Sequence, residues 1–352
     1  MKRKLNVGII GCGRIAGWLQ DDPFREGIVT HVAAYQSFPK QVKVVACASR
    51  TSKDAKAFSR RFNIPKSYAS YTDMLQSEQL DLVSICAYTE SRFEMAKAAI
   101  EAGVKGIFLE KPVGTSLQEI EKLIRLANRK KVCVVVNHTR RWGADYQTVK
   151  RLIDQDKIGK VQSVTAYCSG SLFHTGTHMF DVLQYFFGKP KAVFGKLKKT
   201  LVKRKKANTG SDLSFQDYDG VASFTYPSGL TAQVVGTTKN YFQFEFDIQG
   251  ARGRIRIGNH LLEYYQSKKS KHYSGFYELE KKPLKLKPMK RSALEEAVWE
   301  LIQGVKRGRE TSSSLKDAKE ALEMAFGVIE SHKHKKEIPF PLKEKNQVVL
   351  AR

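Results

Sequence analysis

Acidic residues are scarce in this chain of 352 residues, which has 35 Asp and Glu against 61 Lys and Arg and a formal net charge of +26. Residues 1–130 hold 21 basic and 13 acidic side chains (+8), and the remaining residues hold 40 and 22 (+18), so the excess is spread along the chain. Zinc-finger, RRM and helix-turn-helix signatures are missing, which argues against specific recognition of nucleic acid. We expect the charge to serve solubility and the attraction of an anionic small molecule.

Cysteine is also rare. The five cysteines are odd in number, lie far apart and mostly stand in runs of Val, Ile and Ala, where small buried hydrophobic residues are found. We therefore expect reduced cysteines in a cytoplasmic protein, at Cys12, Cys47, Cys86, Cys133 and Cys168.

Long apolar runs are missing. No run approaches the roughly 18 residues that a membrane span needs, so we expect no membrane partner. Basic residues at positions 2–4 precede an apolar stretch, as in a signal peptide, but Asn6, three glycines and Arg14 interrupt it and no small-residue cleavage site follows. With 41% hydrophobic and 27% charged residues the composition is that of a globular protein, and the length predicts two domains.

The first part of the chain alternates apolar runs with helical patterns. Runs dense in Val and Ile, without polar alternation, are typical of strands buried on both faces of a parallel sheet. Ser91 with Glu94, and Ser116 with Glu119, match the capping box that begins a helix. The pattern predicts an α/β Rossmann domain over residues 1–125. The strands of this first part of the chain are expected at Leu5–Ile10, Val42–Ala48, Leu80–Ala87, Gly106–Leu109 and Val132–Val136.

From about residue 160 the period changes to an alternation of polar and apolar residues, as in Phe242–Gln249, and Tyr226–Gly229 has the composition of a hairpin turn. Helical patterns follow at Leu294–Val305 and Leu315–Glu330. Residues 126–352 are therefore predicted to form an α+β domain with an open, mostly antiparallel sheet, one face of which covers a site or pairs with another subunit. Lys203–Gln216 is expected to be a basic loop and Ser267–Lys290 a second basic region. The other strands are expected at Val161–Cys168, Val193–Lys198, Val221–Tyr226, Leu230–Val235 and Arg254–Ile257.

The first predicted strand runs into Gly11-Cys-Gly13-Arg14-Ile15-Ala16, a form of the dinucleotide fingerprint G-x-G-x-x-G/A. Gly11 would form the tight turn, Gly13 would let the backbone approach a pyrophosphate, and Ala16 would let helix and strand pack closely. A structural glycine-rich turn is the alternative. We predict dinucleotide binding because the motif opens a βαβ pattern.

The second predicted strand ends in Ser49-Arg50-Thr51 rather than in an acidic residue. A carboxylate there would bind a free ribose 2′-hydroxyl, whereas hydroxyls and a guanidinium fit a 2′-phosphate. The sequence therefore favours NADP over NAD. In the alternative interpretation, Arg50 is a solvated loop residue.

Further motifs occur in a fixed order: Glu110-Lys111-Pro112 at a strand end, Arg141-Trp142, and His174-Thr-Gly-Thr-His178-Met-Phe-Asp181. With the glycine motif, they make nearly the whole chain resemble the glucose-fructose oxidoreductase, inositol dehydrogenase and MocA (Gfo/Idh/MocA) family. The resemblance implies an oxidoreductase that moves hydride between NADP and a secondary alcohol or ketone of a sugar, sugar derivative or cyclic polyol, and a homo-oligomer formed through the C-terminal sheet. A non-catalytic NADP-binding sensor or regulator is the alternative.

The resemblance also implies roles for individual residues. Lys111 matches the catalytic lysine, and Glu110 is expected near the nicotinamide ribose or carboxamide. His178 matches the catalytic or substrate-binding histidine, with His174 as its helper. The substrate is expected to meet Arg141, Trp142 and Asp181.

Three departures from the family pattern stand out. His174 replaces an Asp that sugar dehydrogenases of the family often have, and Ala87–Arg92 replaces the pattern T-P-N-x-x-H. Trp18–Thr30 is an insertion that could form a lid or lengthen a helix. The two histidines could share a zinc, but no Glu follows His174 and no third ligand stands at metal spacing, so no metal is expected.

Overall fold

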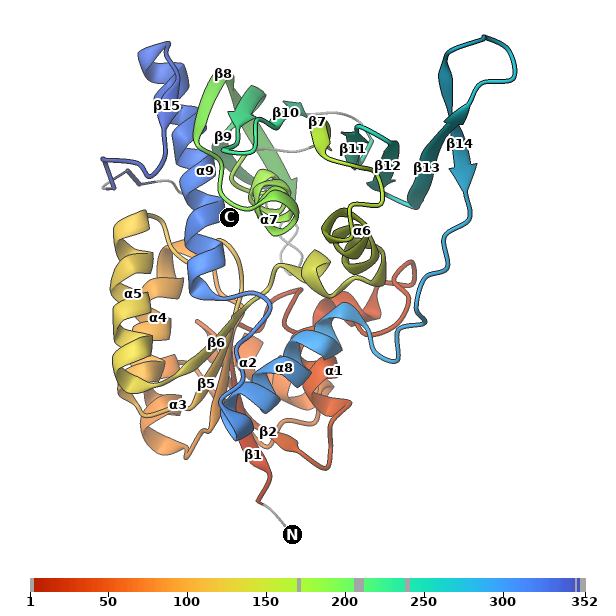
Figure 1. Cartoon of the computed structure of the whole chain (residues 1–352). Coiled ribbons are helices and arrows are strands. Elements are labelled where there is room, and N and C mark those ends of the chain that lie inside the picture. Colours follow the sequence, from red (N-terminus) through yellow and green to blue (C-terminus); the bar gives the residue numbers. More distant parts are fainter. Residues whose placement is uncertain (1–2, 170–171, 206–211, 238–240, 346, 349–352) are drawn as a thin grey trace. The chain divides into compact units, whose positions relative to one another are not determined.

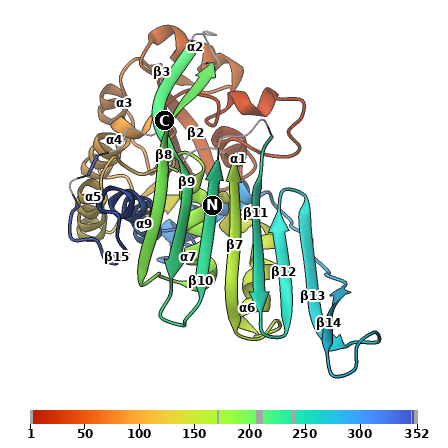
Figure 2. The ribbon, with the colours of Figure 1, turned by 90° about the horizontal axis from the view of Figure 1, so that it is seen from above.

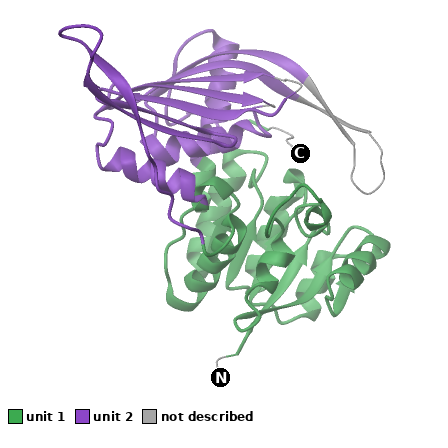
Figure 3. Cartoon of the chain, turned by 90° about the vertical axis from the view of Figure 1, so that its right-hand side faces the viewer, with its two compact units in different colours: residues 1–142, 290–319, 346–352 green, residues 143–289, 320–345 purple. Residues whose placement is uncertain are grey.

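The chain folds into two compact units (Figure 3). The computed structural model describes residues 3–169, 172–205, 212–237, 241–345 and 347–348. Unit 1 comprises residues 1–142, 290–319 and 346–352, and unit 2 comprises residues 143–289 and 320–345. The first division therefore lies at residue 142 rather than near the predicted residue 125, and a later segment returns to unit 1.

Unit 1 is built on a six-stranded parallel sheet (Figure 1) in the spatial order β3-β2-β1-β4-β5-β6. The order reverses between β1 and β4, and sheets of this kind bind ligands beyond the carboxyl ends of the strands at that switch point. The predicted Rossmann fold is confirmed. Its strands are β1 (Leu5–Ile10), β2 (Val42–Ala48), β3 (Lys66–Tyr68), β4 (Leu82–Ile85), β5 (Gly106–Leu109) and β6 (Cys133–Val136).

Helices cover both faces of this sheet. Figure 1 shows α3, α4 and α5 on one side and α1 and α8 on the other. None of the helices in the described part of the chain has the combination of length and apolarity needed to cross a membrane. The helices of this unit are α1 (His31–Gln36), α2 (Ser52–Arg61), α3 (Tyr71–Ser77), α4 (Thr89–Glu101), α5 (Leu117–Lys130) and α8 (Ala293–Arg307), with short 3-10 helices η1 (Trp18–Asp21) and η2 (Thr139–Trp142).

Helix α8 explains why the observed units differ from the predicted domains. Its Leu294, Val298, Leu301 and Ile302 are buried in the core of unit 1, together with Val32 of α1. Burial of each such side chain contributes roughly 1.5–3 kcal/mol, so the segment is held by the first sheet. Strand β6 also extends the parallel sheet beyond the predicted boundary by pairing with β5.

The two predicted helix starts in unit 1 have different outcomes. Ser116 caps α5 as predicted, because its hydroxyl accepts a bond from the N–H of Glu119 at 3.2 Å. The capping box predicted at Ser91 is wrong. The N-cap residue of α4 is Tyr88, three residues before Ser91, and the helix begins at Thr89. A four-residue pattern fits any stretch with the right residue types, whereas the actual start is set by where β4 ends.

Unit 2 contains a nine-stranded sheet in the order β14-β13-β12-β11-β7-β10-β9-β8-β15, seen in Figure 2. All neighbouring pairs are antiparallel except β7 and β10, which are parallel, so the predicted sheet is mixed but mostly antiparallel. The strands are β7 (Val161–Ser169), β8 (Ala192–Lys205), β9 (Asp212–Thr225), β10 (Thr231–Thr237), β11 (Phe244–Gly250), β12 (Gly253–Gly258), β13 (Leu261–Lys269), β14 (Tyr277–Lys282) and β15 (Ile338–Pro339). Its helices are α6 (Ala144–Asp154), α7 (Gly176–Phe187) and the part of α9 (Leu315–His334) from residue 320 onward.

The basic segments of unit 2 are largely strand. The expected loop 203–216 is wrong where it is described, because β8 reaches Lys205 and β9 begins at Asp212; residues 206–211 lie outside the described residues. In the second basic region, β13 and β14 form a hairpin in which Lys281 Nζ lies 2.8 Å from Glu263 Oε1. Such pairs of opposite charge across neighbouring strands stabilise a basic hairpin.

Candidate active site

The glycine motif forms the turn after β1. Gly11 has a φ of +91°, and a Cβ there would lie 2.8 Å from the amide nitrogen of Ala87. Backbone conformation and the close approach of the segment after β4 therefore both exclude a side chain. At Gly13, by contrast, a Cβ would meet no protein atom within 4 Å. This open side of the backbone is what the approach of a pyrophosphate requires.

The helix that follows the glycine turn is interrupted and then resumes. The N–H of His31 bonds to the carbonyl of Ile15 at 3.1 Å, and the N–H of Val32 bonds to that of Ala16 at 2.9 Å. These bonds continue the helical pattern across a gap, so residues 17–30 leave the helix as a loop between its first turn and α1. The insertion is therefore not a lengthened helix.

An aromatic contact anchors this inserted loop. The ring of Trp18 packs edge to face against Phe58 of α2 and Phe62, the residue after that helix, with centroids 6.0 and 5.6 Å away, and its indole N–H donates to the Cys12 carbonyl at 3.1 Å. Arg14, one of the predicted cofactor residues, is exposed, and its guanidinium lies 3.9 Å from a carboxylate oxygen of Asp22 in the loop.

The three residues predicted to select NADP lie together after β2. Ser49 is partly exposed and its N–H bonds to the Tyr68 carbonyl, while Arg50 is exposed and its guanidinium lies 5.6 Å from the centroid of the Tyr88 ring. Thr51 caps α2, because its hydroxyl accepts a bond from the N–H of Asp54 at 3.1 Å. The hydroxyl of Thr51 can still donate, and Arg50 is supported by an aromatic ring at the carboxyl edge of the sheet.

A cluster of buried polar side chains meets at the carboxyl ends of β4, β5 and β6. His31 Nδ1 lies 2.6 Å from the Ser84 hydroxyl, and His31 Nε2 lies 3.0 Å from Glu110 Oε1. Asn137 Nδ2 donates to the same Oε1 at 2.5 Å. Because an ionised carboxylate can only accept, Nε2 of His31 carries the proton in this bond. Of the four residues, only Glu110 was predicted.

The charge of Glu110 is maintained despite burial. Burial by itself raises the pKa of this carboxyl, but the hydrogen bond and charge of His31, the charge of Arg92 and the bond from Asn137 outweigh it and lower the pKa to about 2. Burial, reinforced by the charge of Glu110, raises the pKa of the neighbouring Cys86 thiol well above its ordinary value. Glu110 is therefore an anion at neutral pH and Cys86 a neutral thiol.

Lys111 follows Glu110 and is partly exposed, in a turn that Arg92 holds. Nη1 of the buried Arg92 donates to the Pro112 carbonyl at 2.6 Å, and its Nε donates to the Ala87 carbonyl at 2.9 Å. Burial lowers the pKa of Arg92 to about 10, which leaves it cationic at neutral pH. Arg92 belongs to the segment Ala87–Arg92, which departs from the family pattern. Its two hydrogen bonds join this segment, after β4, to the turn that holds Lys111.

Arg141 and Trp142 make structural contacts within unit 1. Arg141 is buried; its Nη1 donates to the Ser312 carbonyl at 2.8 Å and lies 3.2 Å from an Asp317 carboxylate oxygen. Trp142 is 2% exposed and belongs to the core packed by α8. Both side chains are buried, and the role of each beside a substrate stays a prediction.

Unit 2 carries the predicted histidines at the start of α7. His174 lies in the turn before the helix, His178 in its first turn, and both are partly exposed. Asp181, three residues after His178, is buried at 1% exposure. The first turn of α7 thus presents His178 at the surface, whereas Asp181 lies in the second turn and is buried.

A carboxylate missed in the sequence holds the turn before α7. The buried Asp217 of β9 accepts a bond from the N–H of Phe173 at 3.2 Å, and the N–H of Leu172 bonds to the Tyr218 carbonyl at 3.1 Å. These bonds orient the segment that enters His174. No local signal marks Asp217, because only the pairing of β8 with β9 and the packing of the turn bring it there.

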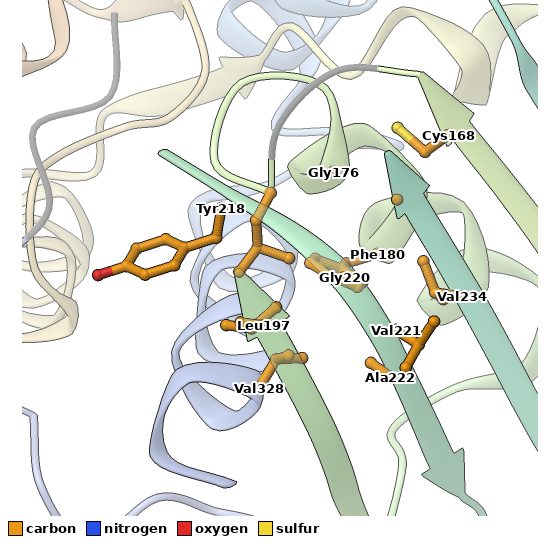
Figure 4. Close-up of a pocket in the computed structure, with 12 residues that line it drawn as sticks. Cys168, Gly176, Phe180, Leu197, Tyr218, Gly220, Val221, Ala222, Val234 and Val328 are labelled. Carbon is orange, nitrogen blue, oxygen red and sulfur yellow. The ribbon is translucent and has the colours of Figure 1, made fainter. Parts of the chain in front are cut away.

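A small apolar pocket lies within unit 2, between the sheet and helices α7 and α9 (Figure 4). Its volume of about 20 Å³ accommodates about one water molecule, so it is too small for a sugar. Figure 4 shows the Tyr218 hydroxyl pointing away from the other labelled side chains. Among the residues that the structure describes, no group of three His, Cys, Asp or Glu side chains could hold a metal ion. The pocket is lined by Cys168, Leu172, Gly176, Phe180, Leu197, Tyr218, Gly220, Val221, Ala222, Val234, Gly236 and Val328.

The carboxyl edge of the unit 1 sheet fits a dinucleotide. Gly13 leaves open space beside the backbone, and the Glu110 side chain is 10% exposed. Asn137 Oδ1 is buried and meets no hydrogen-bond donor within the described part of the chain. An unsatisfied buried acceptor costs about 1–3 kcal/mol, which a ligand donor or a water would recover.

Comparisons with known proteins agree with this arrangement. A model of an oxidoreductase family with an NAD-binding Rossmann fold matches residues 5–138, and a model of the C-terminal alpha/beta domain of the same family matches residues 150–340. The chain is 26% identical over 207 residues to scyllo-inositol 2-dehydrogenase (NADP(+)) IolW of Bacillus subtilis, covering 51% of this chain and 55% of that protein. It is 28% identical over 124 residues to trans-1,2-dihydrobenzene-1,2-diol dehydrogenase of Xenopus tropicalis, covering 35% and 37%. The chain spans about half the length of the curated relatives it matches.

Solved structures share the fold over nearly their whole length. Levoglucosan dehydrogenase in complex with NADH and L-sorbose matches with a TM-score of 0.78 at 19% identity, covering 96% of this chain and 99% of that one. The WlbA dehydrogenase of Bordetella pertussis, in complex with NADH and UDP-GlcNAcA, matches with a TM-score of 0.75 at 17% identity, covering 97% and 100%. The two domain matches show that the chain belongs to the Gfo/Idh/MocA family of oxidoreductases, with an NAD-binding Rossmann domain and a C-terminal α/β domain.

Proposed function

We propose that the protein is an NADP-dependent dehydrogenase or reductase that moves hydride between the nicotinamide and a secondary alcohol or ketone of a sugar, sugar derivative or cyclic polyol. The observation that carries this proposal is the arrangement of unit 1. The glycine turn follows β1 and Glu110-Lys111 follows β5, at one edge of the sheet with only β4 between them. Two strand spacings amount to about 10 Å, which a single dinucleotide can span.

The dinucleotide, when bound, supplies the hydride chemistry, and the chain must handle the proton and the developing charge. In this proposal the Lys111 ammonium stabilises the alkoxide that forms at the reacting oxygen. The His178 imidazole takes the proton from the alcohol, or returns it to the ketone, with His174 assisting. Asp181 and Arg141 border the substrate.

The proposed cofactor residues are Gly11, Gly13, Arg14, Ile15 and Ala16 for the pyrophosphate, and Ser49, Arg50 and Thr51 for a 2′-phosphate. The preference for NADP is supported by the exposed Arg50 guanidinium after β2 and by the absence of an acidic residue from Ala48 to Lys53. The Bacillus subtilis relative is named as an NADP(+) enzyme, which also supports this preference.

Replacing Arg50 with alanine should weaken NADPH binding by about tenfold and leave NADH binding unchanged, because only NADPH offers a phosphate for a charge-assisted hydrogen bond. Fluorescence titration of both cofactors measures this. Arg60→Ala, which removes the same charge from an exposed position of α2, is the matched control and should retain the preference. An Arg50→Ala protein that still prefers NADPH would contradict the proposal.

The substrate class is supported by the two solved structures with the same fold, which are complexes with L-sorbose and with UDP-GlcNAcA. Oxidation of a panel of sugars, cyclic polyols and nucleotide sugars with NADP and with NAD tests it, because turnover is followed directly as nicotinamide absorbance. Absence of turnover with every member of the panel, despite tight NADPH binding, would favour the regulator instead.

We further propose a homo-oligomer formed through the sheet of unit 2. Phe194 of β8 and Val221 of β9 are 51% and 49% exposed on one face of that sheet, a placement that favours burial against a second copy. Phe194→Asp should shift the protein toward monomer in sedimentation velocity experiments. A wild-type protein that is monomeric at assay concentration would overturn this.

A further inference from the structure

The polar cluster of His31, Ser84, Glu110 and Asn137 is not explained by fold stability or by the proposed proton transfer. Both hydrogen bonds that Glu110 accepts end on Oε1, one from His31 and one from Asn137. Within the described residues no donor bonds to Oε2. The His31 side chain has no exposed surface, whereas that of Glu110 is 10% exposed. The carboxylate is thus anchored through one oxygen, and the other is left for a ligand.

The position of His31 depends on the inserted loop. The loop returns the chain to the helix at His31, whose N–H bonds to the Ile15 carbonyl within the glycine motif. The imidazole then stacks on Phe108 of β5, with centroids 4.2 Å apart and planes inclined by 26°. Backbone and ring are both held, so Nε2 is directed at one oxygen of Glu110.

The surrounding charges determine how Glu110 can bind a ligand. His31 on α1 and Arg92 on α4 favour the anion, Cys86 after β4 is a neutral thiol, and Lys111 is the next residue in the chain. An anion that keeps one oxygen available accepts charge-assisted hydrogen bonds, which are stronger than bonds between neutral groups.

We propose that His31 is a positioning residue that acts through Glu110: its Nε2–H holds Oε1, so that Oε2 accepts hydrogen bonds from the hydroxyls or the carboxamide N–H of the nicotinamide riboside end of the dinucleotide. The inference rests on the proposed function because it takes the dinucleotide as the ligand. His31 itself does not touch the ligand.

The first test is the pH dependence of NADPH binding by His31→Leu. Without the donor, burial should raise the pKa of Glu110, and the group should protonate as pH falls and lose its acceptor. The ratio of the variant's dissociation constant to that of the wild type should rise about tenfold between pH 8 and pH 5.5. Taking the ratio removes the titration of NADPH itself. A ratio that is independent of pH would overturn the proposal.

Two variants separate positioning from packing. His31→Gln keeps a side-chain N–H donor, so its ratio should stay nearly constant with pH. His138→Leu removes another buried histidine of unit 1, whose Nδ1 lies 3.1 Å from the Ser313 hydroxyl, much as His31 Nδ1 lies 2.6 Å from that of Ser84. It should lower stability without the acid-side loss of affinity. The same acid-side loss in His138→Leu would show that any buried histidine produces the effect, and would overturn the assignment.

The second test needs no ligand. Infrared spectra of ligand-free His31→Leu at pH 5.5 should contain the carbonyl band of a protonated carboxyl group, which the additional change Glu110→Gln should remove. Wild-type spectra should lack the band. If the wild type binds neither cofactor, the proposed function fails while this measurement still tests the coupling of His31 to Glu110. If the wild type binds NADPH and the band does not appear, the coupling fails alone.

Discussion

Lys111→Ala should lower turnover by at least about 10²-fold while changing the NADPH dissociation constant only a few-fold. The proposed role of the ammonium is to stabilise charge that develops in the transition state, and such an interaction contributes little to ground-state binding. Single-turnover measurements at saturating cofactor separate hydride transfer from binding and product release.

The same strand offers a matched control. Lys105 directly precedes β5, as Lys111 follows it, and its Nζ lies 3.0 Å from Asp81 at the opposite edge of the sheet. Lys105→Ala removes the same charge and should change turnover by no more than about twofold, because Lys105 lies at the edge of the sheet opposite the proposed site. Undiminished hydride transfer in Lys111→Ala would make this lysine a strand-end residue and would favour a non-catalytic dinucleotide-binding regulator.

His178→Ala should lower turnover by about 10²-fold or more, the usual contribution of a positioned acid or base, and His174→Ala should lower it less. Only the neutral imidazole accepts the alcohol proton, so loss of the neutral form of His178 should produce an acid limb in the wild-type profile of oxidation rate against pH. In His178→Ala this acid limb should disappear. Profiles of kcat and kcat/KM against pH for both variants measure the effect.

The comparison of the two variants decides which histidine acts. A larger loss in His174→Ala would exchange the roles proposed for the pair. Wild-type activity of both variants across the pH range would remove proton transfer by histidine from the mechanism, while leaving the proposed role of Lys111 intact.

Much of unit 1 was predictable because buried parallel strands carry an unbroken apolar signal. The bounds of β1, β2 and β5 agree with the predicted ranges, the ends of β4 and β6 differ from them, and the short strand β3 was not predicted. Helix starts were less predictable, as Ser116 and Ser91 illustrate. The parallel pairing of β7 with β10 was not predicted, because strand direction is not encoded in the alternation of polar and apolar residues.

The candidate site likewise contains residues that the sequence identified and contacts that it did not. Gly11 and Gly13 were recognisable because the turn after the first strand demands glycine at particular spacings, and Lys111 was recognisable through the resemblance of the ordered motifs to the family. The contacts of His31 with Glu110 and of Asp217 with the turn before α7 join segments far apart in the sequence, and no local pattern marks them.

The sequence by itself therefore determined most strands of the parallel sheet, the Rossmann class, the dinucleotide motif and the family, since each depends on local periodicity or on short motifs. The tertiary structure alone decided that α8 completes the core of unit 1, that Trp142 is buried, and that a looped-out insertion brings His31 to the carboxylate of Glu110. These outcomes depend on which apolar faces pack together and on which buried donors and acceptors form hydrogen bonds. Such pairings are made in space, and sequence separation does not limit them.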